Sequence, residues 1–221
     1  MGESPYSLLV FDWDGTLMDS SARIVKCIQC AAEVVGVPIV DDNAIRHMIG
    51  LPLEMSVRQL YPGFSNAVLT QLVDEVLRRS FSDEMKISPL FDGVETVLRQ
   101  LAAQGYQLAV ATGKSRRGLN RDMAEAGVTD LFPITRTADE TLSKPNPLML
   151  QEILTDYDMN ATEALMIGDT EYDLQLARNA GMDALAVSYG MHSVSRLLQH
   201  KPCGIINDFA HLPDWLKEYK K

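Results

Sequence analysis

Short apolar runs alternate with amphipathic segments along most of this chain. Six segments have the composition of strands: Leu8–Phe11, Gln107–Ala111, Phe132–Thr135, Ala164–Ile167, Ala184–Val187 and Gly204–Ile206. Five segments between or after them have helical periodicity: Val94–Gln104, Ser115–Ala126, Pro145–Asp156, Asp173–Ala180 and Phe209–Tyr219. This alternation predicts an α/β fold, in which helices cover both faces of a parallel sheet.

The region after the first strand has a different pattern, because helices follow one another there without an intervening strand. Four helices are expected: Ala22–Val35, Asp42–Met48, Leu53–Tyr61 and Asn66–Phe81. Ser20 or Ser21 is a candidate N-cap for the first of them. We therefore predict a core formed by residues 1–18 and 89–221, with a small α-helical insert at residues 19–88.

Two aspartates follow the first strand directly. Asp12 and Asp14 are one residue apart, and Gly15 and Thr16 come next. In open α/β sheets, ligands bind at the carboxyl ends of the strands. Two carboxylates in a small space raise each other's pKa, and a hard cation such as Mg²⁺ relieves the repulsion. The simpler alternative is an Asp-Gly turn that ends a strand.

Further polar residues follow other predicted strands. Thr112 and Gly113 offer a hydroxyl and an unhindered backbone N–H just before a helix, which is an arrangement that binds anions. Asp169 follows Gly168 at another strand end and is a candidate to complete the metal site. Asp173 begins the next predicted helix and could simply cap it. An ordinary strand-to-helix turn is the alternative for Thr112 and Gly113.

Lys144 precedes Pro145, which we expect to begin a helix. A cation at a helix N-terminus opposes the helix dipole unless an anion is also present. A solvated surface lysine is the alternative. If these strand-end residues share one crevice, they surround an anion with a metal, a lysine, a hydroxyl and free amides. That set suits phosphoryl transfer.

Composition limits the possible partners and location. The net charge is −10 over 221 residues, which disfavours nucleic acid and anionic membrane surfaces as partners. No apolar stretch is long enough to span a bilayer, and the N-terminus lacks the pattern of a signal peptide, so we expect a cytoplasmic protein. Cys27 and Cys30 form a C-x-x-C pair without a second pair, and we expect thiols packed in a helix.

In its motifs the sequence resembles the haloacid dehalogenase superfamily, and specifically its phosphoglycolate-phosphatase-like branch. Four motifs carry the resemblance, in this order: Asp12–Thr16, Thr112 with Gly113, Lys144, and Gly168-Asp169 with Asp173. The match covers nearly the whole chain and implies a Rossmann-like core. The helical insert resembles the small cap domain of this branch.

The resemblance also implies roles for these residues. Asp12 would be the nucleophile that forms an aspartyl-phosphate, and Asp14 would be the general acid and base. Mg²⁺ would be bound by the side chains of Asp12 and Asp169 and by the backbone carbonyl of Asp14.

The remaining motif residues would hold the phosphate. Thr112, the Gly113 amide and Lys144 would bind phosphate oxygens, with Lys144 counted among the catalytic residues. Asp173 would not touch the substrate but would hold Lys144 or a metal-bound water in position.

We therefore expect Mg²⁺-dependent hydrolysis of a small phosphorylated metabolite by a monomer or homodimer. Phosphoglycolate, a sugar phosphate or a nucleotide is the expected substrate, in that order. A phosphomutase of the β-phosphoglucomutase type and a non-catalytic phosphometabolite-binding module are the alternatives. The loop Ile49–Leu53 is the candidate to face the site, and Arg46 and Arg58 beside it are either substrate ligands or solvated helix residues.

Overall fold

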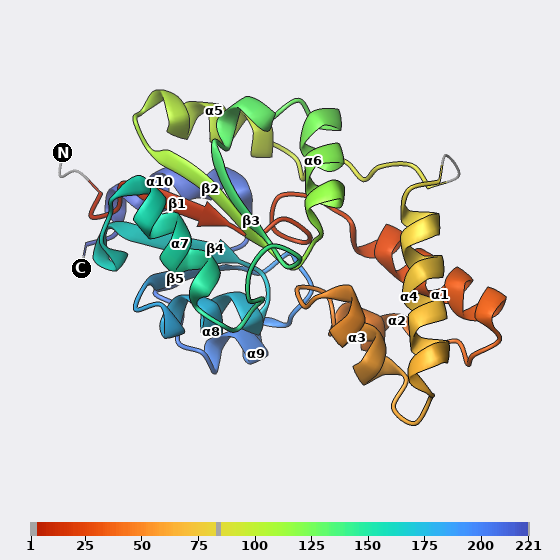
Figure 1. Ribbon diagram of the computed structural model, residues 1–221. Coiled ribbons are helices and arrows are strands. Elements are labelled where there is room, and N and C mark those ends of the chain that lie inside the picture. Colours follow the sequence, from red (N-terminus) through yellow and green to blue (C-terminus); the bar gives the residue numbers. More distant parts are fainter. Residues whose placement is uncertain (1–3, 83–84, 221) are drawn as a thin grey trace.

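Six parallel strands form the sheet of the computed structural model, which describes residues 4–82 and 85–220. Their order across the sheet is β3-β2-β1-β4-β5-β6, so the first strand of the chain lies near the centre (Figure 1). The strands are β1 (Leu8–Phe11), β2 (Gln107–Thr112), β3 (Ile134–Thr137), β4 (Ala164–Gly168), β5 (Asp183–Val187) and β6 (Gly204–Ile206). In β1, Phe11 is in register with Val110 of β2 and Ile167 of β4.

Both faces of the sheet are buried, as the short apolar runs predict. In β1, Leu9 and Phe11 belong to the core on one face, whereas Leu8 and Val10 belong to the core on the other. Three helices pack on the first face: α5 (Val94–Ala103), α6 (Arg116–Glu125) and α10 (Leu212–Glu218). Three others pack on the second face: α7 (Leu148–Tyr157), α8 (Glu171–Asn179) and α9 (Val194–Leu198). The predicted α/β fold is confirmed.

The inserted region contains four helices and a core of its own. They are α1 (Ser21–Val35), α2 (Asp42–Arg46), α3 (Leu53–Leu60) and α4 (Asn66–Ser80). They lie beyond the carboxyl ends of the strands, toward which the strand arrows point (Figure 1). Cys27 is buried in α1 as expected, Cys30 is only half-buried, and both are free thiols.

Several predicted boundaries are wrong. Strand β3 begins at Ile134 rather than Phe132, whose side chain is buried in the core before the strand starts. Helix α7 begins at Leu148, whose N–H donates a hydrogen bond to the side-chain oxygen of Asn146. Lys144 therefore lies before the helix and not at its N-terminus. Helix α8 begins at Glu171, two residues before Asp173.

Other local features also differ from the predictions. Ser20 occupies the N-cap position of α1, but its side chain makes no capping hydrogen bond. Helix α9 was not predicted, because five residues are too few to show a helical period. Single 3-10 turns occur at Thr129–Leu131, Ala161–Glu163 and Phe209–His211. Among the described residues, no helix has both the length and the apolar character that crossing a bilayer requires.

Candidate active site

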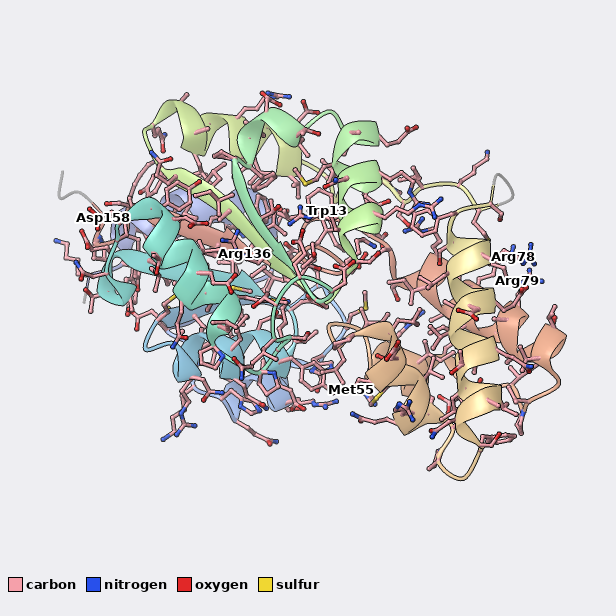
Figure 2. All side chains as sticks on the ribbon, viewed as in Figure 1. Trp13, Met55, Arg78, Arg79, Arg136 and Asp158 are labelled. Atoms are coloured by element: carbon pink, nitrogen blue, oxygen red, sulfur yellow. The ribbon has the colours of Figure 1, made fainter. Side chains whose placement is uncertain are left out.

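Asp12 directly follows the central strand β1 and so lies at the carboxyl ends of the strands. Its backbone N–H donates to the carbonyl of Ile167, so the pairing with β4 continues one residue beyond β1. Trp13, which is labelled in Figure 2, follows and is fully buried. Its ring lies edge-on to that of Phe132, with 6.2 Å between the ring centroids. This packing fixes the strand end and leaves the Asp12 carboxylate on the other side, where only 1% of the residue is exposed.

Three chemically important residues, Lys144, Asp169 and Asp173, meet beside Asp12. Carboxylate oxygens of Asp12, Asp169 and Asp173 lie within 4.8 Å of one another. The ammonium nitrogen of Lys144 is 2.6 Å from Asp12 Oδ1 and 2.6 Å from Asp173 Oδ1. Lys144 and Asp173 are completely buried. The protein interior therefore holds three neighbouring carboxylates and one lysine, which pairs with two of them.

Titration of the cluster reflects this excess of negative charge. Burial raises the pKa of Asp12 to about 7, with a contribution from the charge of Asp173 and against the opposing effect of Lys144. Burial and the charge of Asp12 raise the pKa of Asp169 well above its ordinary value. Burial alone would lower the pKa of Lys144, but its two aspartate partners outweigh burial and raise it. The lysine stays charged and cannot neutralise all three acids.

The hydrogen bonds show which oxygens are available to a cation. Oδ2 of Asp12 has no hydrogen-bond partner among the described residues. Each oxygen of Asp169 accepts one bond, from Thr16 Oγ1 at 2.8 Å and from the Met191 N–H at 2.8 Å. A carboxylate oxygen with one donor keeps a free lone pair. Asp12 and Asp169 therefore offer the hard oxygen ligands that suit Mg²⁺.

Asp173 is engaged differently. Its Oδ2 accepts from both the N–H and the hydroxyl of Thr170, at 2.9 and 2.7 Å, while its Oδ1 faces Lys144. This reciprocal bonding with the N-cap Thr170 starts helix α8 and also fixes the carboxylate. Asp173 therefore holds Lys144 in place beside Asp12.

Asp14 lies outside this cluster. Its carboxylate pairs with Lys114, whose ammonium is 2.9 Å from Oδ2 and also contacts the buried Asp122 at 3.1 Å. Burial favours the neutral form of Asp14, but the Lys114 ammonium outweighs it and holds the pKa of Asp14 below its ordinary value. Asp14 is therefore ionised in this arrangement.

The second predicted motif lies against the helical insert. Thr112 is buried, and its hydroxyl accepts from the Lys114 N–H at 3.2 Å. A Cβ added to Gly113 would lie 2.5 Å from the carbonyl oxygen of Gly50, so only glycine permits this approach of two backbones. Gly190 has a similar role beside Asp169, because a Cβ there would collide with that carboxylate.

A cavity of about 150 Å³ opens between the core and the insert. Asp12, Asp14, Thr112 and Gly113 line it from the core, and the loop containing Gly50 lines it from the insert. The prediction that this loop faces the site is confirmed.

Comparison with known proteins identifies the family. The model of the family described as "Haloacid dehalogenase-like hydrolase" matches residues 9–187. This chain belongs to that family. The resemblance inferred from the four motifs is therefore confirmed, and the chain is referred to below as this hydrolase.

Similar proteins agree over almost the whole length. This hydrolase is 32% identical to "Probable phosphatase IndB" of Dickeya dadantii, over 93% of this chain and 91% of that protein. It is 27% identical to a phosphoglycolate phosphatase of Vibrio vulnificus, over 97% of both chains. A solved structure of a predicted phosphatase from Clostridium acetobutylicum matches with a TM-score of 0.85 and 25% identity, over 97% of this chain and 99% of that one. The likeness includes the helical insert as well as the sheet.

Neither of the two insert arginines considered from the sequence lines this cavity, and Arg58 follows the solvated alternative. Arg58 binds the side chain of Asn66 at an exposed position, at 2.8 Å, and Arg46 lines a separate depression. Arg23 of α1 and Arg121 of α6 line the cavity of this hydrolase instead. One sequence signal for Arg23 exists, since it lies four residues before Cys27 and so shares its buried helical face.

Replacing Lys144 by methionine should lower the free energy of unfolding by about 3–5 kcal/mol near neutral pH in EDTA, because the change leaves two buried carboxylates without their cation. Urea unfolding measures this loss. The matched Lys217→Met change should leave stability unaltered, since that lysine is exposed and pairs with an exposed Asp214. Equal stability of the two variants would contradict a buried ion pair at Lys144.

Proposed function

We propose that this hydrolase releases phosphate from small phosphomonoesters in a Mg²⁺-dependent reaction through an aspartyl-phosphate. One observation carries the proposal: the buried Asp12 has an oxygen without a hydrogen-bond partner among the described residues, beside a charged lysine and at the wall of a cavity. The names of the similar phosphatases support it.

In the proposed first step, a carboxylate oxygen of Asp12 attacks phosphorus. The new P–O bond forms as the bond to the leaving oxygen breaks, and a proton from Asp14 goes to that oxygen. Lys114 keeps Asp14 ionised in the absence of substrate. The negative charge of an incoming phosphate raises the pKa of Asp14, so that it can carry the proton. In the second step water attacks the phosphoryl group, the P–O bond to Asp12 breaks to free its carboxylate, and Asp14 takes the proton from the water.

Lys144, the hydroxyl of Thr112 and the amide of Gly113 bind the phosphate oxygens in this proposal. Asp173 positions Lys144, because it holds the ammonium from the side opposite Asp12. Asp12, Asp169 and the backbone carbonyl of Asp14 would hold Mg²⁺, which when bound neutralises charge on the carboxylates and the phosphate.

The helical insert serves as a cap, with the proposed boundaries at residues 19–88. Its loop at Gly50 already contacts Gly113 of the core. Closure over the cavity keeps water away from the phosphate until the intermediate has formed. The cytoplasmic location and the monomeric or homodimeric state stay predictions.

Purified protein should release inorganic phosphate from phosphoglycolate, from a sugar phosphate or from a nucleotide when Mg²⁺ is present. EDTA should stop the release, and added Mg²⁺ should restore it, because the carboxylates and the phosphate repel one another without the metal. Phosphate assays on this panel, with product analysis of the sugar phosphate, measure both effects. Transfer of phosphate within the sugar without release would indicate a mutase, and binding without turnover would indicate a non-catalytic module.

Asp12→Asn should lower kcat for phosphate release by a factor on the order of 10⁴ or more, because the amide cannot capture the phosphoryl group. The fold should persist, as judged by circular dichroism. Asp19→Asn is the matched control, since Asp19 is exposed in the same loop, and it should retain activity. Intact mass of acid-quenched wild-type protein during turnover should show a phosphoryl adduct that Asp12→Asn lacks. Substantial turnover by Asp12→Asn would refute the nucleophilic role.

A further inference from the structure

Three cationic side chains line the cavity: Arg23 from α1, Lys114 from the loop after β2, and Arg121 from α6. Two of them have their donors occupied. Lys114 binds Asp14 and Asp122. Arg121 directs Nε and Nη2 to Oδ1 of Asp122, and its Nη1 to a backbone carbonyl at the end of α4. Neither is available to a ligand without breaking an ion pair.

Arg23 is in a different state. Its side chain is only 9% exposed, and its one partner within the described part of the chain is Asp122, at 3.5 Å from Nη2. Nε and Nη1 are buried and have no hydrogen-bond acceptor among the described residues. A buried guanidinium with unused N–H groups requires an acceptor, and the cavity is the open space in front of it.

Other arginines of the insert either have partners or lie outside this cavity: Arg46, whose buried Nε also lacks a partner among the described residues, lines a separate depression. Arg58 binds Asn66, and Arg78 and Arg79 bind Glu75. Figure 2 shows Arg78 and Arg79 on the side of α4 that faces away from the sheet. Arg23 is therefore the arginine of the insert that combines a place in this cavity with unused donors among the described residues.

The rest of the cap wall narrows the choice of ligand. It is largely apolar, with Ile24, Ile28, Ile45, Leu51 and Leu53 among its members. A neutral hydroxyl brings a donor as well as an acceptor, and its donor would face this apolar wall. A carboxylate is acceptor-only and negatively charged, which matches a donor-only, positively charged guanidinium. The volume of about 150 Å³ is small compared with the ~300–1,000 Å³ of many ligand pockets, which favours a substrate of few atoms.

We propose that Arg23 binds a carboxylate on the leaving group of the substrate and so selects small carboxylated phosphomonoesters over neutral ones. The proposal rests on the proposed phosphatase function and names its substrate class. The phosphate lies at Asp12 in the core while the carboxylate lies at α1 of the insert. A substrate with both groups therefore links the two regions and favours the closed arrangement.

The test compares two substrates of similar size, 2-phosphoglycolate and 2-hydroxyethyl phosphate, which differ in the carboxylate. The wild-type protein with Mg²⁺ should have a higher kcat/KM for phosphoglycolate. Arg23→Gln should reduce the ratio of the two kcat/KM values by about 10- to 100-fold, the loss expected for one charge-assisted hydrogen bond. Arg58→Gln, a change on the same insert but outside the cavity, should leave the ratio as in wild type.

The neutral substrate also reports whether the Arg23→Gln protein is folded and active. A wild-type ratio near one, or a ratio that Arg23→Gln does not change, would overturn the proposed role of Arg23 while leaving the phosphatase proposal intact. Failure of the wild type to hydrolyse either substrate or p-nitrophenyl phosphate with Mg²⁺ would instead overturn the phosphatase function itself.

Discussion

The ammonium of Lys144, buried between Asp12 and Asp173, is the interaction on which the site depends. A buried carboxylate without compensation would take up a proton and lose its nucleophilicity. Lys144 compensates part of the charge, but Asp169 adds another carboxylate to the same space. We propose that the remaining excess attracts a cation, for which Oδ2 of Asp12 and the unused lone pairs of the Asp169 oxygens would be ligands.

The fold brings these charges together from three separate parts of the chain, since only Asp169 and Asp173 are close in sequence. Asp12 and Asp169 follow adjacent parallel strands, so the register of β1 with β4 sets their separation. Asp173 lies in the first turn of α8, where its Oδ2 accepts hydrogen bonds from both the backbone N–H and the hydroxyl of Thr170. A second ionic network is centred on Asp122, which pairs with Lys114 and Arg121. Lys114 also pairs with the carboxylate of Asp14, and Arg23 of the insert pairs with Asp122. The proposed acid, Asp14, and the proposed carboxylate-binding residue, Arg23, are thus linked through one ionic network.

The alternation of apolar runs predicts the parallel sheet and the helical insert, because burial on both faces leaves a clear pattern in each strand. The sequence also predicts Asp12, Asp14 and Asp169 as site residues, because each follows the visible end of an apolar, strand-like run. The reason for the position of Lys144 is not visible: the sequence suggests a helix N-terminus, whereas the structure holds it by two ion pairs. The role that we propose for Arg23 is not predictable from the sequence either, because an unused donor can be recognised only after the tertiary partners are known.

Calorimetric titration of metal-free protein with Mg²⁺ near neutral pH tests the charge argument most directly. One Mg²⁺ should bind per chain, and Asp169→Asn should weaken binding strongly because it removes both a ligand and part of the excess charge. Glu171→Gln is the matched control, since that nearby acid is already paired with Arg196, and it should bind as the wild type does. Absence of Mg²⁺ binding by the wild type, or equal binding by Asp169→Asn, would contradict the account.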